Sequence, residues 1–322
     1  MSAVAGLRPR RAGAAPGRGT AEPARAPQRR LALLGTGTVG AAFVARYQRL
    51  QSRGLALPKV AWLANSRSVQ ACGSGLDAAL EQAIAAPRRE LLLQGWAEAE
   101  ALHAGDIVVD ATASELVADW HPEWLARGVS VVTANKLGHG SLLARSQAIV
   151  EAQCATGARY GDSATVGAGL PLLGSLRALV AGGDRIHAVE GVLSGSLGWL
   201  FGRFDGTCPF SDCVREAAAA GYTEPDPRVD LSGEDVRRKL LILARAAGLA
   251  LEPAQVRVES LLPAALAAAA PGAVDGLLHL LDAPLASRLQ QAQATGAKLR
   301  FVGRFDADGA TVGLRTLPAD HP

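Results

Sequence analysis

The chain has 322 residues, of which 49% are hydrophobic and 20% charged, a composition typical of a soluble globular protein with about two domains. Its net charge of +3 is uneven, because residues 1–30 contain seven arginines and one glutamate, so the remainder carries a net charge of −3. This acidic remainder argues against a nucleic-acid-binding face, and no apolar segment is long enough to cross a bilayer. We therefore expect a cytoplasmic protein without nucleic-acid or membrane partners.

The N-terminal segment, residues 1–29, consists mainly of Ala, Gly, Pro and Arg. So few large apolar side chains cannot offset the ordering entropy, and we expect a disordered leader. An arginine-rich, acid-poor leader is also typical of organelle transit peptides, but hydroxyl-bearing residues are scarce here. A disordered extension or a misassigned start is therefore favoured over a targeting signal.

Short apolar segments alternate with helical patterns after the leader. The segments predicted to be strands are 31–34, 59–64, 106–111 and 129–133, with helical patterns at 39–53 and, interrupted by loops, at 74–104. Buried strands separated by helices predict βαβ units and a doubly wound parallel sheet. We assign residues 30–156 to a Rossmann-type dinucleotide-binding domain of this α/β class.

The pattern changes from about residue 158. Strands are predicted at 158–162, 186–193 and 299–305, and helices at 170–181, 211–220 and 232–247. Strands and helices without regular alternation predict an α+β domain, which we place over residues 157–322.

A glycine-rich turn follows the first strand. Gly35, Thr36, Gly37, Thr38, Val39 and Gly40 fit the pattern G-x-G-x-x-G. The first glycine permits the tight turn, the second lets a pyrophosphate approach the backbone, and the third lets helix and strand pack closely. The pattern alone is weak, but its strand–turn–helix context favours dinucleotide binding over a purely structural turn.

Three other strand ends point to the same crevice. The second strand is followed by Asn65, Ser66 and Arg67 instead of the acid that NAD-selective sites usually offer to the ribose. Arg67 could pair with a 2′-phosphate, which favours NADP, although NAD and an exposed loop arginine stay open. Thr112 and Lys136 follow the next two strands, and Lys136 faces either the nicotinamide and substrate or solvent.

Acids and a lysine are concentrated between residues 221 and 239. Ser232 is a candidate N-cap, and Asp235 and Lys239 lie four residues apart on one face of the helix that follows. Reduction of a carbonyl needs a hydride donor, a proton donor and groups that hold the substrate. Lys239, oriented by Asp235, is a suitable proton donor, and Glu224 could hold a substrate ammonium group. The alternative is an exposed ion pair worth about 0.3–0.5 kcal/mol.

With these motifs the chain resembles the homoserine dehydrogenases, most closely the dehydrogenase half of the bifunctional aspartokinase–homoserine dehydrogenases. The matching segments are 31–40, 108–114, 131–136, 165–173, 190–202 and 221–245. The resemblance implies a nucleotide-binding domain, a catalytic and dimerisation domain, and a homodimer or higher oligomer. It also implies reversible reduction of L-aspartate 4-semialdehyde to L-homoserine with NADPH or NADH, a step toward threonine, methionine and isoleucine.

The resemblance also implies roles for individual residues. Lys239 corresponds to the proton donor and Lys136 to a second essential lysine, while Asp235 is both a catalytic and a substrate-binding acid. The other substrate-binding acids are Glu224 and Asp230, the cofactor positions include Thr112, Lys136 and Gly221, and backbone carbonyls of Val166, Ala168 and Leu170 match a site for Na⁺ or K⁺.

The chain departs from the family in three places. Val229 replaces the first of two adjacent acids, and Ser163 stands where many members have a glutamate, which leaves the cation site open. The chain also ends where the family continues with further strands and a helix, so we expect a domain truncated at its C-terminus. The alternative to an active enzyme is therefore a truncated, idle subunit. A different Rossmann-type oxidoreductase is disfavoured by residues 221–245.

Overall fold

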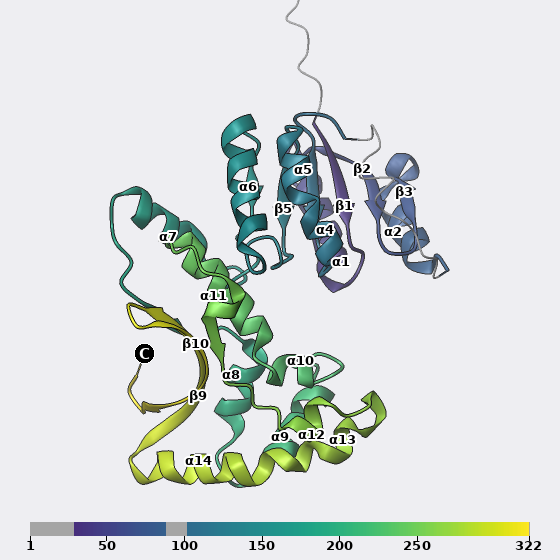
Figure 1. Cartoon of the computed structure of the whole chain (residues 1–322). Helices are drawn as coiled ribbons and strands as arrows, with labels where there is room; N and C mark the ends of the chain where they lie inside the picture. The colour runs from purple at the N-terminus through teal and green to yellow at the C-terminus, as the bar shows by residue number, and fades with distance from the viewer. Residues whose placement is uncertain (1–28, 88–101, 322) are drawn as a thin grey trace, which may run out of the picture.

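The computed structural model describes residues 29–87 and 102–321 and divides them between two units (Figure 1). The predicted leader lies outside the described residues except for Arg29, and so do residues 88–101 of the predicted helical stretch at 74–104. Within the described part, no helix is long and apolar enough to cross a membrane.

The first unit is built on a six-stranded sheet. Its elements are β1 (Arg30–Leu34), α1 (Thr38–Ser52), β2 (Lys59–Ala64), β3 (Val69–Ala71), the 3₁₀ turn Cys72–Ser74, α2 (Leu76–Ala85), β4 (Ile107–Asp110), α4 (Glu115–Asp119), α5 (His121–Ala126), β5 (Ser130–Thr133), α6 (Leu143–Thr156) and β6 (Tyr160–Gly161). The strand order is β3-β2-β1-β4-β5-β6, and only β3 runs antiparallel to its neighbour. The predicted doubly wound parallel sheet is therefore confirmed.

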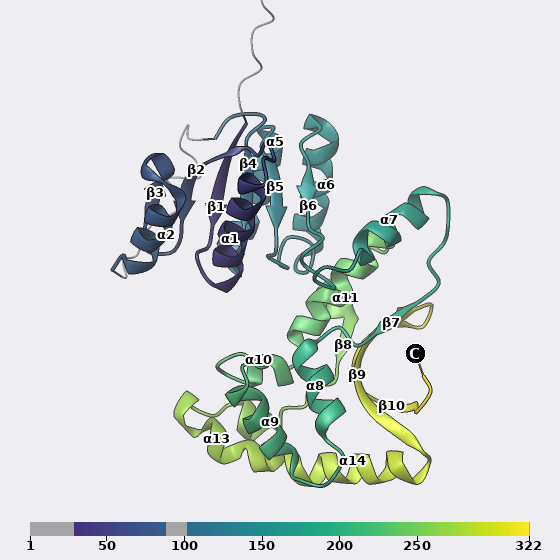
Figure 2. The ribbon, with the colours of Figure 1, turned by 180° about the vertical axis from the view of Figure 1, so that it is seen from behind.

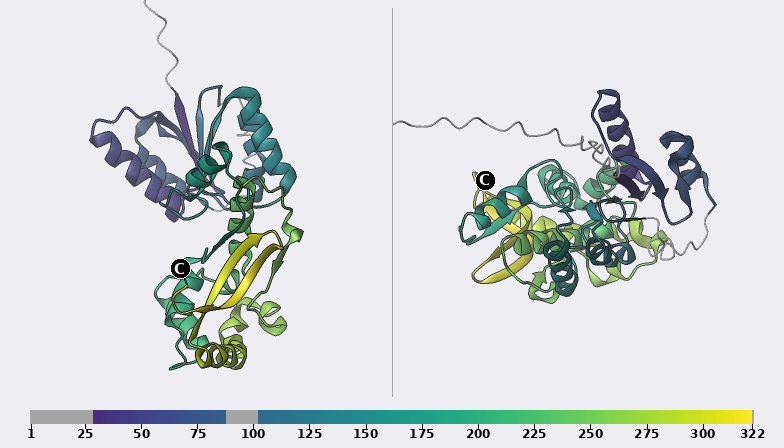
Figure 3. Two further views of the ribbon diagram at one scale, coloured as in Figure 1. Left: turned by 90° about the vertical axis from the view of Figure 1, so that its left-hand side faces the viewer. Right: turned by 90° about the horizontal axis from the view of Figure 1, so that it is seen from above.

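Helices cover both faces of this sheet because the side chains of β1 alternate between two apolar clusters. Leu31 and Leu33 pack with residues of α1 and α2, whereas Ala32 and Leu34 pack with residues of α5 and α6. A strand that is buried on both faces needs such a continuous apolar run. Figure 2 shows the α1 side, and the left view of Figure 3 shows α1 and α6 on opposite sides of the sheet.

The second unit contains a four-stranded sheet of order β7-β9-β10-β8. Its helices are α7 (Leu172–Ala181), α8 (Gly195–Arg203), α9 (Phe210–Ala219), α10 (Arg228–Leu231), α11 (Glu234–Ala246), α12 (Ala264–Ala267), α13 (Val274–Leu277) and α14 (Asp282–Ala294). Its strands are β7 (Val189–Gly191), β8 (Val256–Val258), β9 (Ala297–Asp306) and β10 (Gly309–Pro318), and its 3₁₀ turns are Pro253–Gln255, Pro271–Ala273 and Leu278–Leu281. One apolar cluster joins α8, α11 and α14 to the sheet, as expected for an α+β unit.

One predicted strand belongs to a different sheet. We placed residues 158–162 in the second unit, but Tyr160 and Gly161 pair with Val131 and Val132 of β5, so β6 is the edge of the first sheet. A two-residue strand has too little local pattern to reveal its partner, and long-range pairing decides its place.

Candidate active site

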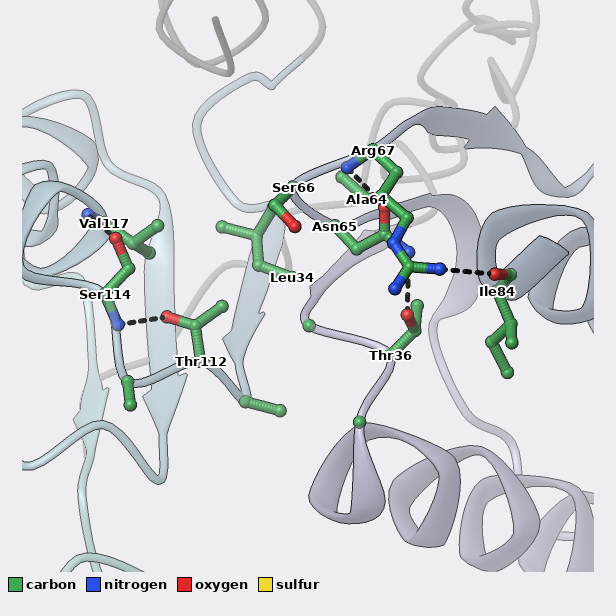
Figure 4. A pocket seen from close by; sticks show the side chains of 14 residues that line it. Leu34, Thr36, Ala64, Asn65, Ser66, Arg67, Ile84, Thr112, Ser114 and Val117 are labelled. Carbon is green, nitrogen blue, oxygen red and sulfur yellow. Dashed lines mark hydrogen bonds between the residues drawn. The ribbon is translucent and has the colours of Figure 1, made fainter. Parts of the chain in front are cut away.

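A cavity of about 460 Å³ lies at the carboxyl ends of the central strands of the first sheet (Figure 4). Its walls come from residues 35–37 after β1, 65–67 after β2 and 111–114 after β4. The sheet grows from β1 to β2 on one side and then continues from β4 on the other side of β1, so the strand order reverses at β1. Ligands of open α/β sheets bind at such a reversal. The cavity is therefore the candidate cofactor site.

The three glycines of the turn have different surroundings. Gly35 has a φ of 93°, and a Cβ there would lie 2.7 Å from the carbonyl oxygen of Ala111. A Cβ on Gly40 would overlap the carbonyl oxygen of Gly35, whereas a Cβ on Gly37 would meet no atom within 4 Å. The backbone at Gly37 thus faces open space. Gly37 is the N-cap of α1, and no side chain caps this helix N-terminus. Free helix N–H groups beside open space suit a phosphate.

The remaining residues of the turn are Thr36, Thr38 and Val39. Thr36 lines the cavity, whereas Thr38 starts α1 and Val39 is 52% exposed. Only Thr36 of these three therefore has a side chain placed against the cavity.

The loop after β2 is held by Asn65, a residue for which the sequence predicted no role of its own. The side-chain oxygen of Asn65 accepts the backbone N–H groups of Arg67 at 2.8 Å and Ser68 at 3.0 Å. Its amide nitrogen donates to Thr36 Oγ1 at 2.8 Å, which ties this loop to the glycine-rich turn. Arg67 donates one guanidinium N–H to the carbonyl of Ile84 at 2.9 Å and lines the cavity (Figure 4). The guanidinium group of Arg67 thus lies at the wall of the cavity.

Three predicted site residues form one ionic cluster. Asp235 Oδ2 lies 2.7 Å from Lys239 Nζ, and Asp235 Oδ1 lies 3.2 Å from Lys136 Nζ. Lys136 follows β5 in the first unit, whereas Asp235 and Lys239 lie on α11, which Figure 1 shows running toward that unit. Burial acts to raise the pKa of Asp235, but the two lysines outweigh it and hold that pKa below its usual value. Asp235 therefore stays ionised between the two ammonium groups.

Leu193 before α8 and Ser196 in the first turn of α8 join this cluster to Asp230 on α10, which in turn holds the loop after α9. The backbone carbonyl of Leu193 accepts from Lys239 Nζ at 2.8 Å, and Ser196 Oγ donates to Asp230 Oδ1 at 2.6 Å. Asp230 Oδ2 also accepts the backbone N–H of Glu224 at 2.9 Å. Ser196 was missed in the sequence, although a serine pair directly after a predicted strand is a signal for a helix start.

The side chain of Glu224 is exposed, and within the described residues no hydrogen bond or ion pair reaches its carboxylate. Both oxygens of Asp230 and both of Asp235 are engaged by protein groups. Of the three predicted substrate-binding acids, Glu224 is therefore the one with an open carboxylate.

The predicted N-cap of α11 is wrong by one residue. The N-cap is Gly233, whose φ of 80° places it in the left-handed region, and it makes no side-chain cap. Ser232 Oγ instead donates to the carbonyl of Val229 at 2.8 Å and accepts the N–H of Glu234 at 3.2 Å. A Cβ on Gly233 would lie 2.9 Å from a ring carbon of Phe301, so the close packing of α11 on β9 requires glycine there.

The predicted cation site lies on the loop before α7. Val166 is buried, Leu170 is 61% exposed, and Ala168 has a φ of 49°, unusual for a residue other than glycine. Ser163 is exposed and supplies no carboxylate, and the described residues contain no group of three or more His, Cys, Asp or Glu side chains that could hold a metal. A site made of carbonyls stays a prediction.

Gly221, a predicted cofactor residue, has a φ of 73° and is exposed at the end of α9.

His139 is a buried ionisable group near the contact between the two units. Its Nδ1 lies 2.7 Å from Ser146 Oγ, and its ring meets Tyr160 edge-on with the centroids 4.9 Å apart. Burial lowers the pKa of His139 to about 4. Ionisable neighbours add smaller effects: Asp162 raises this pKa, whereas Arg177, Arg245 and His121 lower it further. The imidazole is therefore neutral at pH 7.

We expect His139 to make the folded chain less stable as the pH falls from about 6.5 to 4. In this range the unfolded chain binds a proton that the folded chain excludes, so unfolding becomes easier by about 3 kcal/mol in total. His139→Asn keeps a partner for Ser146 but cannot titrate, and denaturant unfolding at a series of pH values should show this slope removed. His279→Asn, at an exposed histidine, should leave the slope unchanged. Equal slopes in all three proteins would contradict the assignment.

Two family models match consecutive parts of this chain. Residues 35–161 match the family model for the NAD-binding domain of homoserine dehydrogenase, and residues 171–322 match the model for homoserine dehydrogenase. Bifunctional aspartokinase/homoserine dehydrogenase 2 of Escherichia coli (strain K12) is 40% identical over 91% of this chain and 37% of its own length. Homoserine dehydrogenase of Schizosaccharomyces pombe is 40% identical over 67% of this chain and 60% of its own length. The chain thus spans less than two thirds of the length of these relatives.

Solved structures share the fold. A protein of unknown function from Candida auris has a TM-score of 0.76 and 34% identity, with 91% of this chain and 85% of that chain covered. A hyperthermophilic archaeal homoserine dehydrogenase in complex with NADPH has a TM-score of 0.66 and 21% identity, with 91% and 83% covered. Two matched family models along one chain, together with the curated relatives, show that the chain belongs to the homoserine dehydrogenase family.

Proposed function

We propose that this chain catalyses the NAD(P)H-dependent interconversion of L-aspartate 4-semialdehyde and L-homoserine. The observation that carries the proposal is the convergence of Lys136 and Lys239 on Asp235. Lys136 follows β5, which lies beside β4, and the loop after β4 lines the candidate cofactor cavity. This arrangement supports a site in which two ammonium groups act next to the bound nicotinamide.

The residues divide the chemistry between them. A bound nicotinamide cofactor supplies the hydride. Lys239 carries the proton that the aldehyde oxygen needs, and it takes this proton back when the alcohol is oxidised. Asp235, ionised between the two lysines, orients Lys239 and holds Lys136 in place. In this scheme Lys136 adds positive charge near the oxygen, where negative charge develops.

Substrate binding falls to the acid whose carboxylate has no protein partner among the described residues. Glu224 has an open carboxylate on a stiff, proline-containing loop, and we assign it to the ammonium group of homoserine. Asp230, whose two oxygens bind Ser196 and the Glu224 backbone, holds that loop in place.

We propose NADP as the preferred cofactor, with Arg67 on the 2′-phosphate. Arg67→Ala should weaken NADPH binding by about 1.5–3 kcal/mol, the value of a lost charge-assisted hydrogen bond, and leave NADH almost unchanged. Fluorescence titration with each cofactor measures both effects. Arg46→Ala, at an exposed arginine in the middle of α1, is the control and should alter neither. Equal weakening of both cofactors would give Arg67 a purely structural role.

Three further assignments complete the proposal. We propose a homo-oligomer of at least two copies, a location in the cytoplasm although several family relatives are named chloroplastic, and a Na⁺ or K⁺ ion on the carbonyls of Val166, Ala168 and Leu170. Light scattering after gel filtration tests the first, and replacement of both ions by tetramethylammonium in the assay tests the last.

The experiment that tests the main proposal is reduction of NADP⁺ by the purified chain in the presence of L-homoserine. Absorbance that rises with L-homoserine but not with L-serine or L-threonine is expected. A folded chain that binds NADPH but reduces no NADP⁺ with homoserine would instead support the alternative of an idle subunit.

A further inference from the structure

A buried carboxylate lies beneath the candidate cofactor site. Asp110 ends β4, is fully buried, and accepts the backbone N–H of Thr112 on Oδ1 at 2.8 Å. Its Oδ2 lies 2.9 Å from Nε2 of His121, which is also fully buried. Because an ionised carboxylate only accepts hydrogen bonds, Nε2 carries the proton of this contact. A carboxylate buried to this depth is costly unless such donors satisfy it.

The imidazole of His121 is itself held in place. Its Nδ1 lies 2.9 Å from the hydroxyl of Tyr160 on β6. Gly138 packs directly over this contact, since a Cβ there would overlap the Tyr160 hydroxyl and lie 3.2 Å from His121 Nδ1. The turn that follows Lys136 therefore rests on the His121–Tyr160 pair.

A second set of hydrogen bonds joins the loop after β5 to the loop after β4. Thr133 Oγ1 donates to the backbone carbonyl of Asp110 at 3.3 Å and accepts the N–H of Asn135 at 2.9 Å. The Asn135 amide donates to the carbonyl of Ser114 at 2.9 Å. Asp110 thus lies where the cofactor loop, residues 111–114, meets the lysine loop, residues 133–137.

We propose that Asp110 and His121 are positioning residues: they fix the cofactor loop through Thr112, and His121 also supports the turn behind Lys136. Neither touches substrate or cofactor in this scheme. The effect on turnover rests on the proposed function, whereas the effect on cofactor binding does not. Without the His121 donor, the carboxylate of Asp110 loses one of its bonds, and the N–H of Thr112 loses a fixed acceptor.

A matched pair of variants tests the proposal. His121→Gln keeps an N–H donor that can reach Asp110, whereas His121→Met has a similar volume and no donor. We expect His121→Met to weaken NADPH binding about tenfold in a fluorescence titration and to lower kcat, and His121→Gln to stay within about threefold of the unaltered chain. KM for homoserine should not change, because Glu224 and Asp230 lie in the other unit.

A purely structural role predicts a different result. His121→Met would then lower the unfolding temperature while the folded fraction kept its NADPH affinity, and that outcome would overturn the proposal. Tyr160→Phe removes only the hydroxyl that faces His121 and covers the case in which His121→Met does not fold. It should weaken NADPH about two- to fivefold, and unchanged affinity would also overturn the proposal. A chain that binds NADPH but never oxidises homoserine would refute the proposed function and leave the binding measurements valid.

Discussion

Replacement of Lys239 by alanine is expected to lower kcat by about 10²–10⁴-fold, the usual contribution of a general acid. Lys239 Nζ is held by Asp235 at 2.7 Å and by the carbonyl of Leu193 at 2.8 Å, so its ammonium group has a defined position. Alanine removes the proton donor and leaves the cofactor cavity, which lies in the first unit, intact. Steady-state kinetics in both directions, together with an NADPH titration, separates the two effects.

Lys239→Arg distinguishes proton transfer from charge. Arginine can keep the ion pair with Asp235 but does not release its proton near neutral pH, so this variant should be nearly as slow as Lys239→Ala. Lys298→Ala, at an exposed lysine of β9, is the control and should keep full activity. A Lys239→Arg enzyme with more than half of the original kcat would remove Lys239 from the role of proton donor.

Local features of the sequence were sufficient to predict most of the first unit. The strand predicted at 59–64 is β2 without any change of bounds, and β1 is the predicted apolar run with one added residue, Arg30. Both are short apolar runs that end at loop-forming residues, a pattern that short-range physics determines. The helix α8 was missed because three of its nine residues are glycines, which lower intrinsic helix propensity. The packing of Leu197 and Leu200 in the core overrides that preference.

The site was only partly predictable because its contacts join distant segments. The pairing of Asp235 with Lys239 followed from their spacing of four residues, but nothing local indicated that Lys136 would reach the same carboxylate. The same holds for Ser196 and Asp230, which are 34 residues apart. The N-cap of α11 is Gly233 and not Ser232, and its left-handed φ and its close contact with Phe301 are features that helix-start rules do not contain.

Gly40 has no room for a side chain and Gly37 has open space, so alanine at the two positions should affect stability and cofactor binding differently. Gly40→Ala would press a methyl group into the carbonyl oxygen of Gly35, whose own N–H is bound to the carbonyl of Ala64 at 2.8 Å. The backbone of the turn or helix α1 must therefore shift to make room for the methyl group. We expect a loss of about 3 kcal/mol or more in the free energy of unfolding, at the upper end for overpacking. Urea denaturation measures it.

Gly37→Ala should weaken cofactor binding and have little effect on stability. Gly37 has a φ of −75°, which alanine adopts freely, and a Cβ would meet no atom within 4 Å, so the loss of a preferred N-cap residue and the gain from a stiffer unfolded chain should nearly cancel and stability should change by less than about 1 kcal/mol. If the pyrophosphate lies against this backbone, the methyl group occupies its place, and the NADPH dissociation constant should rise at least about tenfold. Gly174→Ala, at an equally open glycine in α7, is the control: it should leave NADPH affinity unchanged and raise stability by about 1 kcal/mol, the difference in helix propensity between glycine and alanine. A stable Gly37→Ala chain with unaltered NADPH affinity would show that the phosphates bind elsewhere, and a Gly40→Ala chain of normal stability would remove the packing role of the third glycine.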